Sequence, residues 1–187
     1  MSPNFDAVLA KSKLGFSDGT RGLDEIPMHI RPAAFGAATY EFEVVNGQPH
    51  FHNFQIIGGQ VPGEQTVPRA ETWAAIVLLT RVHFNAVARL GIDAAYVTLG
   101  SGNRHKLCKG KNGDLWGLFF TILDLRTAEV GISKVTSHLE DVGTLAVEQD
   151  YATICDIVGN ALADEAAELT AKLLKPNKSA IEESERI

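Results

Sequence analysis

The spacing of hydrophobic and polar positions predicts that the chain begins with strands. Residues 13–18 alternate as a short strand that ends at Asp18-Gly19. Residues 33–45 form a second strand-like run, and Asn46-Gly47 is typical of a tight hairpin turn. Residues 50–58 then pair with that run as a hairpin. The first third of the chain therefore predicts three antiparallel strands in succession.

Helical patterns alternate with shorter apolar runs in the rest of the chain. The predicted elements are, in order, a helix over 69–90, a strand over 94–99, a helix over 114–125, a strand over 129–137 and a helix over 157–174. A strand that follows a long crossover helix returns parallel to a neighbouring strand. The expected fold class is α/β, with a mixed five-stranded sheet (three antiparallel strands, then two parallel additions) flanked by helices.

Composition narrows the class of protein. The chain has 187 residues, of which 45% are hydrophobic and 21% charged, which excludes disordered and coiled-coil proteins. We expect one domain over 1–175 and a frayed C-terminal tail over 176–187. No apolar run reaches the roughly 20 residues of a membrane-spanning helix, and the first residues lack the apolar core of a signal peptide. Two cysteines, Cys108 and Cys155, cannot make a disulfide framework. We therefore expect an intracellular protein, cytoplasmic or nuclear, without a membrane partner.

The charge of the chain limits how it could bind nucleic acid. Lys and Arg number 17 against 23 Asp and Glu, which gives a formal net charge of −6. A chain of that sign does not attract phosphate backbones by its overall field, so a nucleic-acid partner requires a local basic patch. One loop between Asn103 and Asn112 is basic and contains no acidic residue. It carries Arg104, Lys106, Lys109 and Lys111. Taken alone, such a loop is more often simply solvated.

Four motifs lie where predicted strands end or helices begin. They are Phe16-Ser17-Asp18-Gly19-Thr20, Arg69-Ala70-Glu71, Asn112-Gly113-Asp114-Leu115-Trp116, and Ser137-His138 with the later run Gly159-Asn160-Ala161-Leu162-Ala163-Asp164-Glu165-Ala166-Ala167. In this order they resemble the ribonuclease H type 1 family, including the ribonuclease H domains of retroelement polyproteins. The resemblance runs from about Leu14 to Ala171. It implies a ribonuclease H-like fold and hydrolysis of the RNA strand of RNA/DNA hybrids.

The resemblance also implies cofactors and partners. The cofactor is Mg²⁺, with Mn²⁺ as a substitute. The partner is an RNA/DNA hybrid or another nucleic acid, and the chain could belong to a reverse-transcriptase polyprotein. The expected oligomeric state is a monomer.

Physical reasoning connects the acidic motif residues with metal-dependent hydrolysis. Two Mg²⁺ ions can neutralise the attacking and leaving oxygens of a phosphodiester, and Mg²⁺ prefers oxygen ligands. Carboxylates crowded together without a cation repel one another. Asp18 lies at the end of the first predicted strand, while Glu71 and Asp164 lie on helices that cross that end. The resemblance implies that these three acids are catalytic metal ligands.

The remaining roles also come from the resemblance. His138 would assist near the metals in protonation or product release. Asn160 lies one helical turn before Asp164, on the same face, and would contact the 2′-hydroxyl of the RNA strand. The basic loop 104–111 would grip the DNA strand. Residues 139–158 form an insertion after His138 relative to the family.

The family has a fourth acid, an Asp at the end of the strand after the long helix. With that strand predicted at 94–99, Leu99 or Gly100 occupies its position, and neither side chain binds Mg²⁺. Asp93 would then lie at the opposite end of the strand, roughly 20 Å away. Of the other acids nearby, Glu140 and Asp141 stay as alternatives.

Two other functions stay open at this point. The absent fourth acid favours a catalytically inactive ribonuclease H-like module that binds nucleic acid or protein. The three retained acids favour the enzyme, because they would repel one another without a metal. A Ser/His/Asp hydrolase would use Ser101, His138 and Asp164, but no nucleophile-elbow helix follows Ser101. The sequence favours the metal-dependent nuclease.

Overall fold

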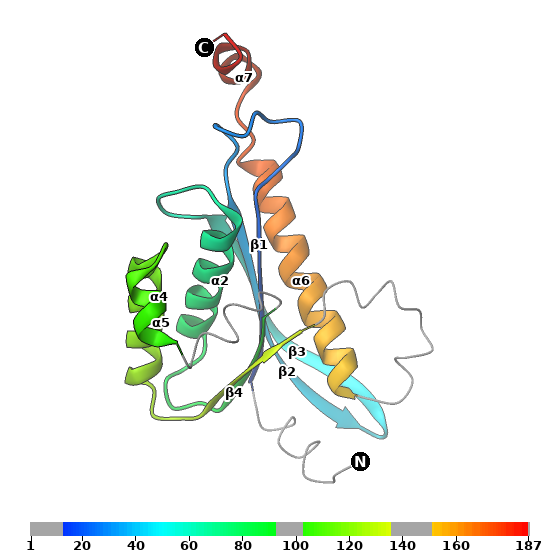
Figure 1. Cartoon of the computed structure of the whole chain (residues 1–187). Coiled ribbons are helices and arrows are strands. Elements are labelled where there is room, and N and C mark those ends of the chain that lie inside the picture. Colours follow the sequence, from blue (N-terminus) through cyan, green and yellow to red (C-terminus); the bar gives the residue numbers. More distant parts are fainter. Residues whose placement is uncertain (1–12, 93–102, 136–150, 187) are drawn as a thin grey trace.

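A computed structural model describes residues 13–92, 103–135 and 151–186 of the chain. These residues form one five-stranded mixed sheet with helices on both faces (Figure 1). The elements are β1 (Lys13–Thr20), β2 (Ala34–Val45), β3 (Gln48–Gln60), α2 (Val67–Arg81), β4 (Ala88–Ile92), α4 (Arg104–Lys109), α5 (Gly113–Leu125), β5 (Val130–Lys134), α6 (Tyr151–Leu173) and α7 (Lys178–Ser184). None of these helices is long and apolar enough to cross a membrane.

The sheet has the strand order β3-β2-β1-β4-β5. β2 pairs antiparallel with both β1 and β3, while β4 pairs parallel with both β1 and β5. The hairpin between β2 and β3 turns at Asn46 and Gly47, whose φ angles of 52° and 76° are those of a tight hairpin turn. The predicted α/β class and the predicted mixed sheet are both confirmed.

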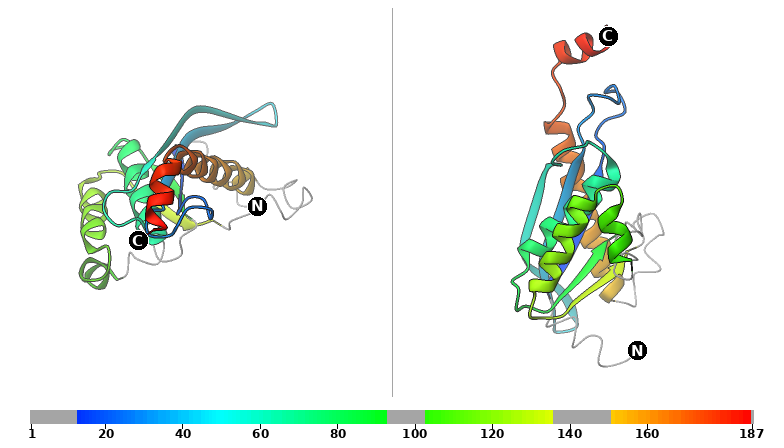
Figure 2. Two further views of the ribbon diagram at one scale, coloured as in Figure 1. Left: turned by 90° about the horizontal axis from the view of Figure 1, so that it is seen from above. Right: turned by 60° about the vertical axis from the view of Figure 1, so that its left-hand side comes forward.

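Alternation along β1 directs its side chains to two separate cores. Leu14 and Phe16 pack with α6 on one face of the sheet, and Gly15 lies against Leu78 of α2 on the other. α2 and α5 share the second core with β4, and Figure 2 shows them on the side of the sheet opposite α6. β1 is therefore the central strand on which the two layers of helices converge.

The helix predicted over 69–90 is wrong at its C-terminal end. α2 ends at Arg81, and β4 begins at Ala88 within the predicted helix. The Arg126 guanidinium donates hydrogen bonds to carbonyl oxygens around this connection, which satisfies groups that a helix would otherwise pair. β4 lies between two parallel neighbours and is largely buried on both faces, so its sequence lacks the alternation of a half-exposed strand. The strand predicted over 94–99 lies outside the described residues.

Three other segments differ from expectation. The basic stretch expected to be a loop is largely helical, as α4. α6 begins at Tyr151, so residues 151–158 of the expected insertion belong to the last helix. The C-terminal tail contains α7, which Asn177 caps by accepting a hydrogen bond from the Ala180 amide. The domain boundary at residue 175 stays a prediction.

Candidate functional site

The end of β1 and the middle of α6 bring Asp18 and Asp164 together. Asp18 is half-buried in β1, and its Oδ1 accepts a hydrogen bond of 2.7 Å from the Gly19 amide. The side chain of Asp164, also half-buried, lies within hydrogen-bonding reach of the Asp18 carboxyl. Two residues that the sequence analysis placed in separate motifs, 146 positions apart (164 − 18), therefore meet in the structure.

Glycines allow α6 to approach the sheet closely enough for this contact. A Cβ at Gly159 would lie 1.9 Å from the Phe16 ring of β1, and one at Gly36 of β2 would lie 1.9 Å from the Ala163 carbonyl oxygen. Any larger side chain at either position would push the helix away. The position of Asp164 thus depends on a close helix–sheet contact made one residue before it.

Glu71 reaches the same end of β1 from the other layer of helices. A Cβ on Gly19 would lie 2.6 Å from the Glu71 amide nitrogen, so the start of α2 packs directly on the residue after Asp18. α2 begins at Val67, which places Glu71 just beyond the first turn and not at the helix opening. Its half-buried carboxylate acts electrostatically on Asp18.

Burial and neighbouring acids raise the pKa of Asp18. Loss of hydration is the largest cause, and the charge and hydrogen bonding of Asp164 and the charge of Glu71 add to it. The Gly19 amide opposes the shift, because it stabilises the ionised carboxylate. The pKa of Asp18 is raised to about 7. The site therefore holds acidic groups in a place where their negative charge is unfavourable.

The donor set fits a hard divalent cation. No Lys or Arg in the described part of the chain forms an ion pair with Asp18 or Asp164, and all the candidate donors are carboxylate oxygens. Their side chains, as placed, do not close into a metal cage: among the described residues no three acidic, His or Cys groups are close enough to hold an ion. Asp18 and Asp164 are in contact, and Glu71 acts over a longer range.

The register of β4 bears on the position of the fourth acid. Ile92 ends β4 and is paired with Ser17, the residue before Asp18. The described part of the strand after the long helix runs to Ile92, and the next residue in the sequence is Asp93. The expected placement of Leu99 or Gly100 at the position of the acid assumed a helix that continues to residue 90, and β4 at Ala88–Ile92 contradicts that assumption. The placement itself stays a prediction. Asp93, Leu99 and Gly100 themselves lie outside the described residues.

Asn160 lies one helical turn before Asp164 on α6, as the spacing predicts. Its residue surface is 9% exposed, and no hydrogen bond from its side chain occurs within the described segments. The expected contact with the 2′-hydroxyl of RNA stays a prediction. His138, Ser101, Glu140 and Asp141 fall outside the described residues, so their expected roles stay predictions too.

The basic stretch is only partly free to bind a nucleic acid. Both terminal guanidinium nitrogens of Arg104 lie 2.8 Å from the Asp124 carboxylate, and the guanidinium covers the Phe120 ring at 4.6 Å. The Lys111 ammonium lies 3.4 Å from the Glu64 carboxylate. Lys106 and Lys109 are exposed and form no ion pair with another described residue. Two of the four expected basic contacts are therefore already paired with acids.

Arg69 joins two of the sequence motifs, a role that the sequence did not indicate. The Arg69 guanidinium donates to both carboxylate oxygens of Asp114, at 3.0 and 2.6 Å, and to Asn112 Oδ1 at 3.2 Å. It also donates to the Pro62 carbonyl oxygen at 2.6 Å. This fork ties the start of α2, two residues before Glu71, to the start of α5. Arg69, two residues before Glu71, is visible in the sequence, but its partner Asp114 is 45 residues away and no local pattern connects the two.

Comparisons with known proteins support the fold. No family model matches the chain, and no curated protein is similar to it in sequence. The chain is similar in structure to the RNase H domain of prototype foamy virus, with a TM-score of 0.60 and 17% identity, over 87% of this chain and 95% of that domain. It is also similar to the N-terminal RNase H domain of Rv2228c from Mycobacterium tuberculosis, solved as a fusion with maltose binding protein, with a TM-score of 0.53 and 14% identity over 88% and 99% of the two chains.

A third similar structure is much longer than this chain. The protease–reverse transcriptase of prototype foamy virus matches with a TM-score of 0.58 and 13% identity, over 83% of this chain and 21% of that one. The chain thus spans about a fifth of the length of that protein. At these identities the three structures show that the chain has a ribonuclease H-like fold.

Proposed function

We propose that the chain is a ribonuclease H-type endonuclease that binds Mg²⁺, or Mn²⁺ in its place, and hydrolyses the RNA strand of RNA/DNA hybrids. The observation that carries the proposal is the contact between the half-buried carboxyl groups of Asp18 and Asp164, with Glu71 close enough to act on them. Charge confined in this way favours a divalent cation. The ribonuclease H-like fold supports the same assignment for the chain as a whole.

The three acids would hold the cation through their carboxylate oxygens, the ligands that Mg²⁺ prefers. When bound, the metal would neutralise charge on the attacking and leaving oxygens of the phosphodiester. Asp18 must be ionised to act as a ligand, so its raised pKa means that binding releases a proton near neutral pH. His138 would assist proton transfer, as the family resemblance implies.

The competing function is a catalytically inactive module with the same fold. It was favoured by the apparent lack of an acid after the fourth strand. The described part of β4 runs to Ile92 and the sequence continues with Asp93, so we propose Asp93 as that acid, which favours the enzyme over the inactive module. The inactive module is distinguished from the enzyme by a single result, namely binding of a hybrid without cleavage.

A cleavage assay on a hybrid with a labelled RNA strand tests the proposal. The wild-type chain should cut the RNA strand with Mg²⁺ or Mn²⁺ and leave it intact in EDTA. D18N and D164N should lose cleavage, whereas E165Q, which changes the exposed neighbour of Asp164 on α6, should keep it. Cleavage that survives in D18N would overturn the assignment of the site, and wild-type binding without cleavage would support the inactive module.

A further inference from the structure

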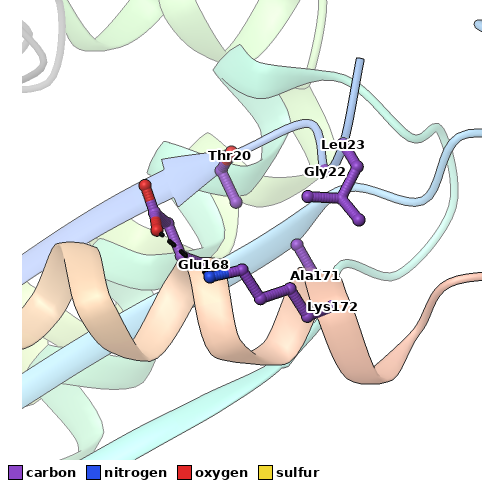
Figure 3. A pocket seen from close by; sticks show the side chains of 6 residues that line it. All are labelled: Thr20, Gly22, Leu23, Glu168, Ala171 and Lys172. Atoms are coloured by element: carbon purple, nitrogen blue, oxygen red, sulfur yellow. Dashed lines mark ion pairs between the residues drawn. The ribbon is translucent and has the colours of Figure 1, made fainter. Parts of the chain in front are cut away.

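A small pocket adjoins the candidate site at the end of β1. Its walls come from the end of β1 and the loop after it on one side, and from the last turns of α6 on the other (Figure 3). The lining residues are Thr20, Gly22, Leu23, Glu168, Ala171 and Lys172. The cavity measures about 120 Å³, well below the roughly 300–1,000 Å³ of pockets that hold whole small molecules. It therefore suits one group of a larger ligand and not a free nucleotide.

The pocket is continuous with the acidic pair along both of its walls. Thr20 lies two residues after Asp18 in β1, on the same side of the strand. Glu168 lies one helical turn after Asp164 on α6, and Lys172 lies one turn further. At 1.5 Å per residue, Lys172 is about 12 Å beyond Asp164 along the helix axis. A polymer lying across the acids and following α6 would pass over the pocket.

The lining offers both a cation and hydrogen-bonding groups. The Lys172 ammonium lies 3.8 Å from the Glu168 carboxylate, and these side chains are 56% and 58% exposed. An exposed pair at this distance is weak, so the ammonium can exchange its partner for a phosphate. Ala171 is buried beneath them, and Gly22, with φ of +76°, adds no side chain to the opposite wall.

We propose that this pocket binds one sugar–phosphate unit of the RNA strand, a few nucleotides from the cleaved bond. The inference rests on the proposed function. Lys172 binds the phosphate, and the Glu168 carboxylate accepts a hydrogen bond from a 2′-hydroxyl, a donor that DNA lacks. A DNA unit offers the Glu168 carboxylate no hydroxyl, so the charge of the carboxylate near the phosphates is left uncompensated and the pair of side chains that admits RNA disfavours DNA. The Thr20 hydroxyl can donate a hydrogen bond to the phosphate or accept one from the 2′-hydroxyl.

The first test compares two lysines that form the same kind of ion pair on different helices, one inside the pocket and one outside it. Lys172 pairs with Glu168 and Lys178 pairs with Glu182, each at 3.8 Å and four residues apart in a helix, but Lys178 lies on α7 outside the pocket. We expect K172A to raise the KM for hybrid cleavage several-fold and to lower the salt slope of binding by about one, with kcat little changed. K178A should match the wild type. Equal behaviour of K172A and K178A would overturn the inference.

The second test locates the 2′-hydroxyl. Hybrids that are cut at one position receive a single deoxynucleotide at each RNA position within about five nucleotides on either side of the cut. Wild type should lose cleavage efficiency at one position away from the cut, and E168A should show no further loss there, because the side chain that accepts the bond is gone. The same loss in wild type and E168A at every position would contradict the assigned contact.

The two proposals fail in different ways. If the wild-type chain neither cuts nor binds a hybrid, the proposed function is wrong. If it cuts the hybrid, but K172A behaves as K178A does and E168A as the wild type does, the pocket is not an RNA subsite and the proposed function stands.

Discussion

The carboxyl group of Asp18 couples ionisation to folding. Its pKa is raised to about 7 in the folded chain, chiefly by burial, whereas an Asp in an unfolded chain titrates near 3.9. Between about pH 4 and pH 7 the folded chain holds a proton that the unfolded chain has lost, so this group's contribution to stability falls as pH rises through that window. We expect D18N to resemble the wild type near pH 4 and to be the more stable protein above pH 7. Urea denaturation across that range without divalent metal measures the difference.

E165Q is the control for this comparison, because Glu165 is exposed on the same helix as Asp164. Its stability should follow the wild type at every pH. Adding Mg²⁺ above pH 7 should stabilise the wild type and leave D18N unchanged, because a bound cation offsets the charge that burial disfavours. A difference between D18N and wild type that does not vary with pH would contradict the electrostatic explanation.

Asp93 is the second residue whose substitution is informative. It follows β4 directly in the sequence, after the strand that pairs with β1 up to Ser17. We expect D93N to lower kcat by more than the roughly 10- to 100-fold typical of losing a residue that only supports a metal ligand. The cleavage assay with Mg²⁺ measures this, with E165Q again as the control. Full activity in D93N would mean that the acids of the described site act without a ligand from this position.

Asp18, Glu71 and Asp164 could be selected from the sequence because each lies in a local motif with a fixed order along the chain, and their role as metal ligands stays a prediction. The sequence did not indicate which residues of the basic stretch are paired with acids. Asp124 and Glu64 neutralise Arg104 and Lys111 from positions 20 and 47 residues away (124 − 104 and 111 − 64), and no local pattern indicates such partners. The reach of a long side chain is a property of the tertiary structure, so sequence identified the cations but not which of them are free.

At the level of elements, the contact of α6 with the sheet sets the distance between the two acids. Gly159 lies inside α6, where a Cβ would meet the Phe16 ring at 1.9 Å, whereas a Cβ at Gly117 inside α5 would meet nothing within 4 Å. Alanine favours a helix over glycine by up to about 1 kcal/mol, so G117A should be neutral or stabilising. We expect G159A to destabilise the fold by about 1–3 kcal/mol through overpacking, as measured by urea denaturation.

The same pair of variants tests whether the contact positions Asp164. If α6 moves outward in G159A, the Asp18–Asp164 contact is lost, and cleavage should fall even at temperatures where the variant is fully folded. G117A should retain wild-type cleavage. A G159A protein that is as stable and as active as G117A would mean that the helix tolerates the methyl group without moving.

The error at the end of α2 has an identifiable cause. Residues 82–87 continue the apolar spacing of a helix, and β4 lacks alternation because both of its faces are covered. The carbonyl oxygens left free where the helix ends are bound by the Arg126 side chain, from about 40 residues away. The short hairpin between β2 and β3 was predicted correctly, because its turn signal is local. Helix and strand boundaries that depend on local residues could be predicted from the sequence, whereas those that depend on distant side chains could not.

For the molecule as a whole, a mixed five-stranded sheet with three antiparallel strands and two parallel additions followed from the sequence, because hairpins and crossover helices permit few arrangements. The functional surface is harder to predict, since it depends on how charges on separate elements combine. The chain has a net charge of −6, so its overall field opposes the approach of a nucleic acid. Association with a hybrid must then depend on the few cations that are unpaired among the described residues or held only by weak, exposed ion pairs.

The distribution of charge predicts how the affinity for a hybrid changes with salt concentration. Lys106 and Lys109 on α4 are exposed and form no ion pair within the described segments, so they can release counterions on contact with phosphates. We expect K106Q/K109Q to weaken hybrid binding and to lower the slope of log K against log salt by about two. Fluorescence anisotropy with a labelled hybrid, in the D18N background to prevent cleavage, measures the slope.

The matched control neutralises both members of two ion pairs, Arg104–Asp124 and Lys111–Glu64. R104Q/D124N combined with K111Q/E64Q removes two positive and two negative charges and leaves the net charge unchanged. Arg104 would have to leave a carboxylate that it binds through two nitrogens at 2.8 Å, whereas the exposed Lys111–Glu64 pair at 3.4 Å can open. We therefore expect the slope to fall by no more than about one relative to D18N alone. A decrease as large as that of K106Q/K109Q would mean that Arg104 and Lys111 exchange their acidic partners for phosphates on binding, and the whole of α4 with Lys111 would then form the contact.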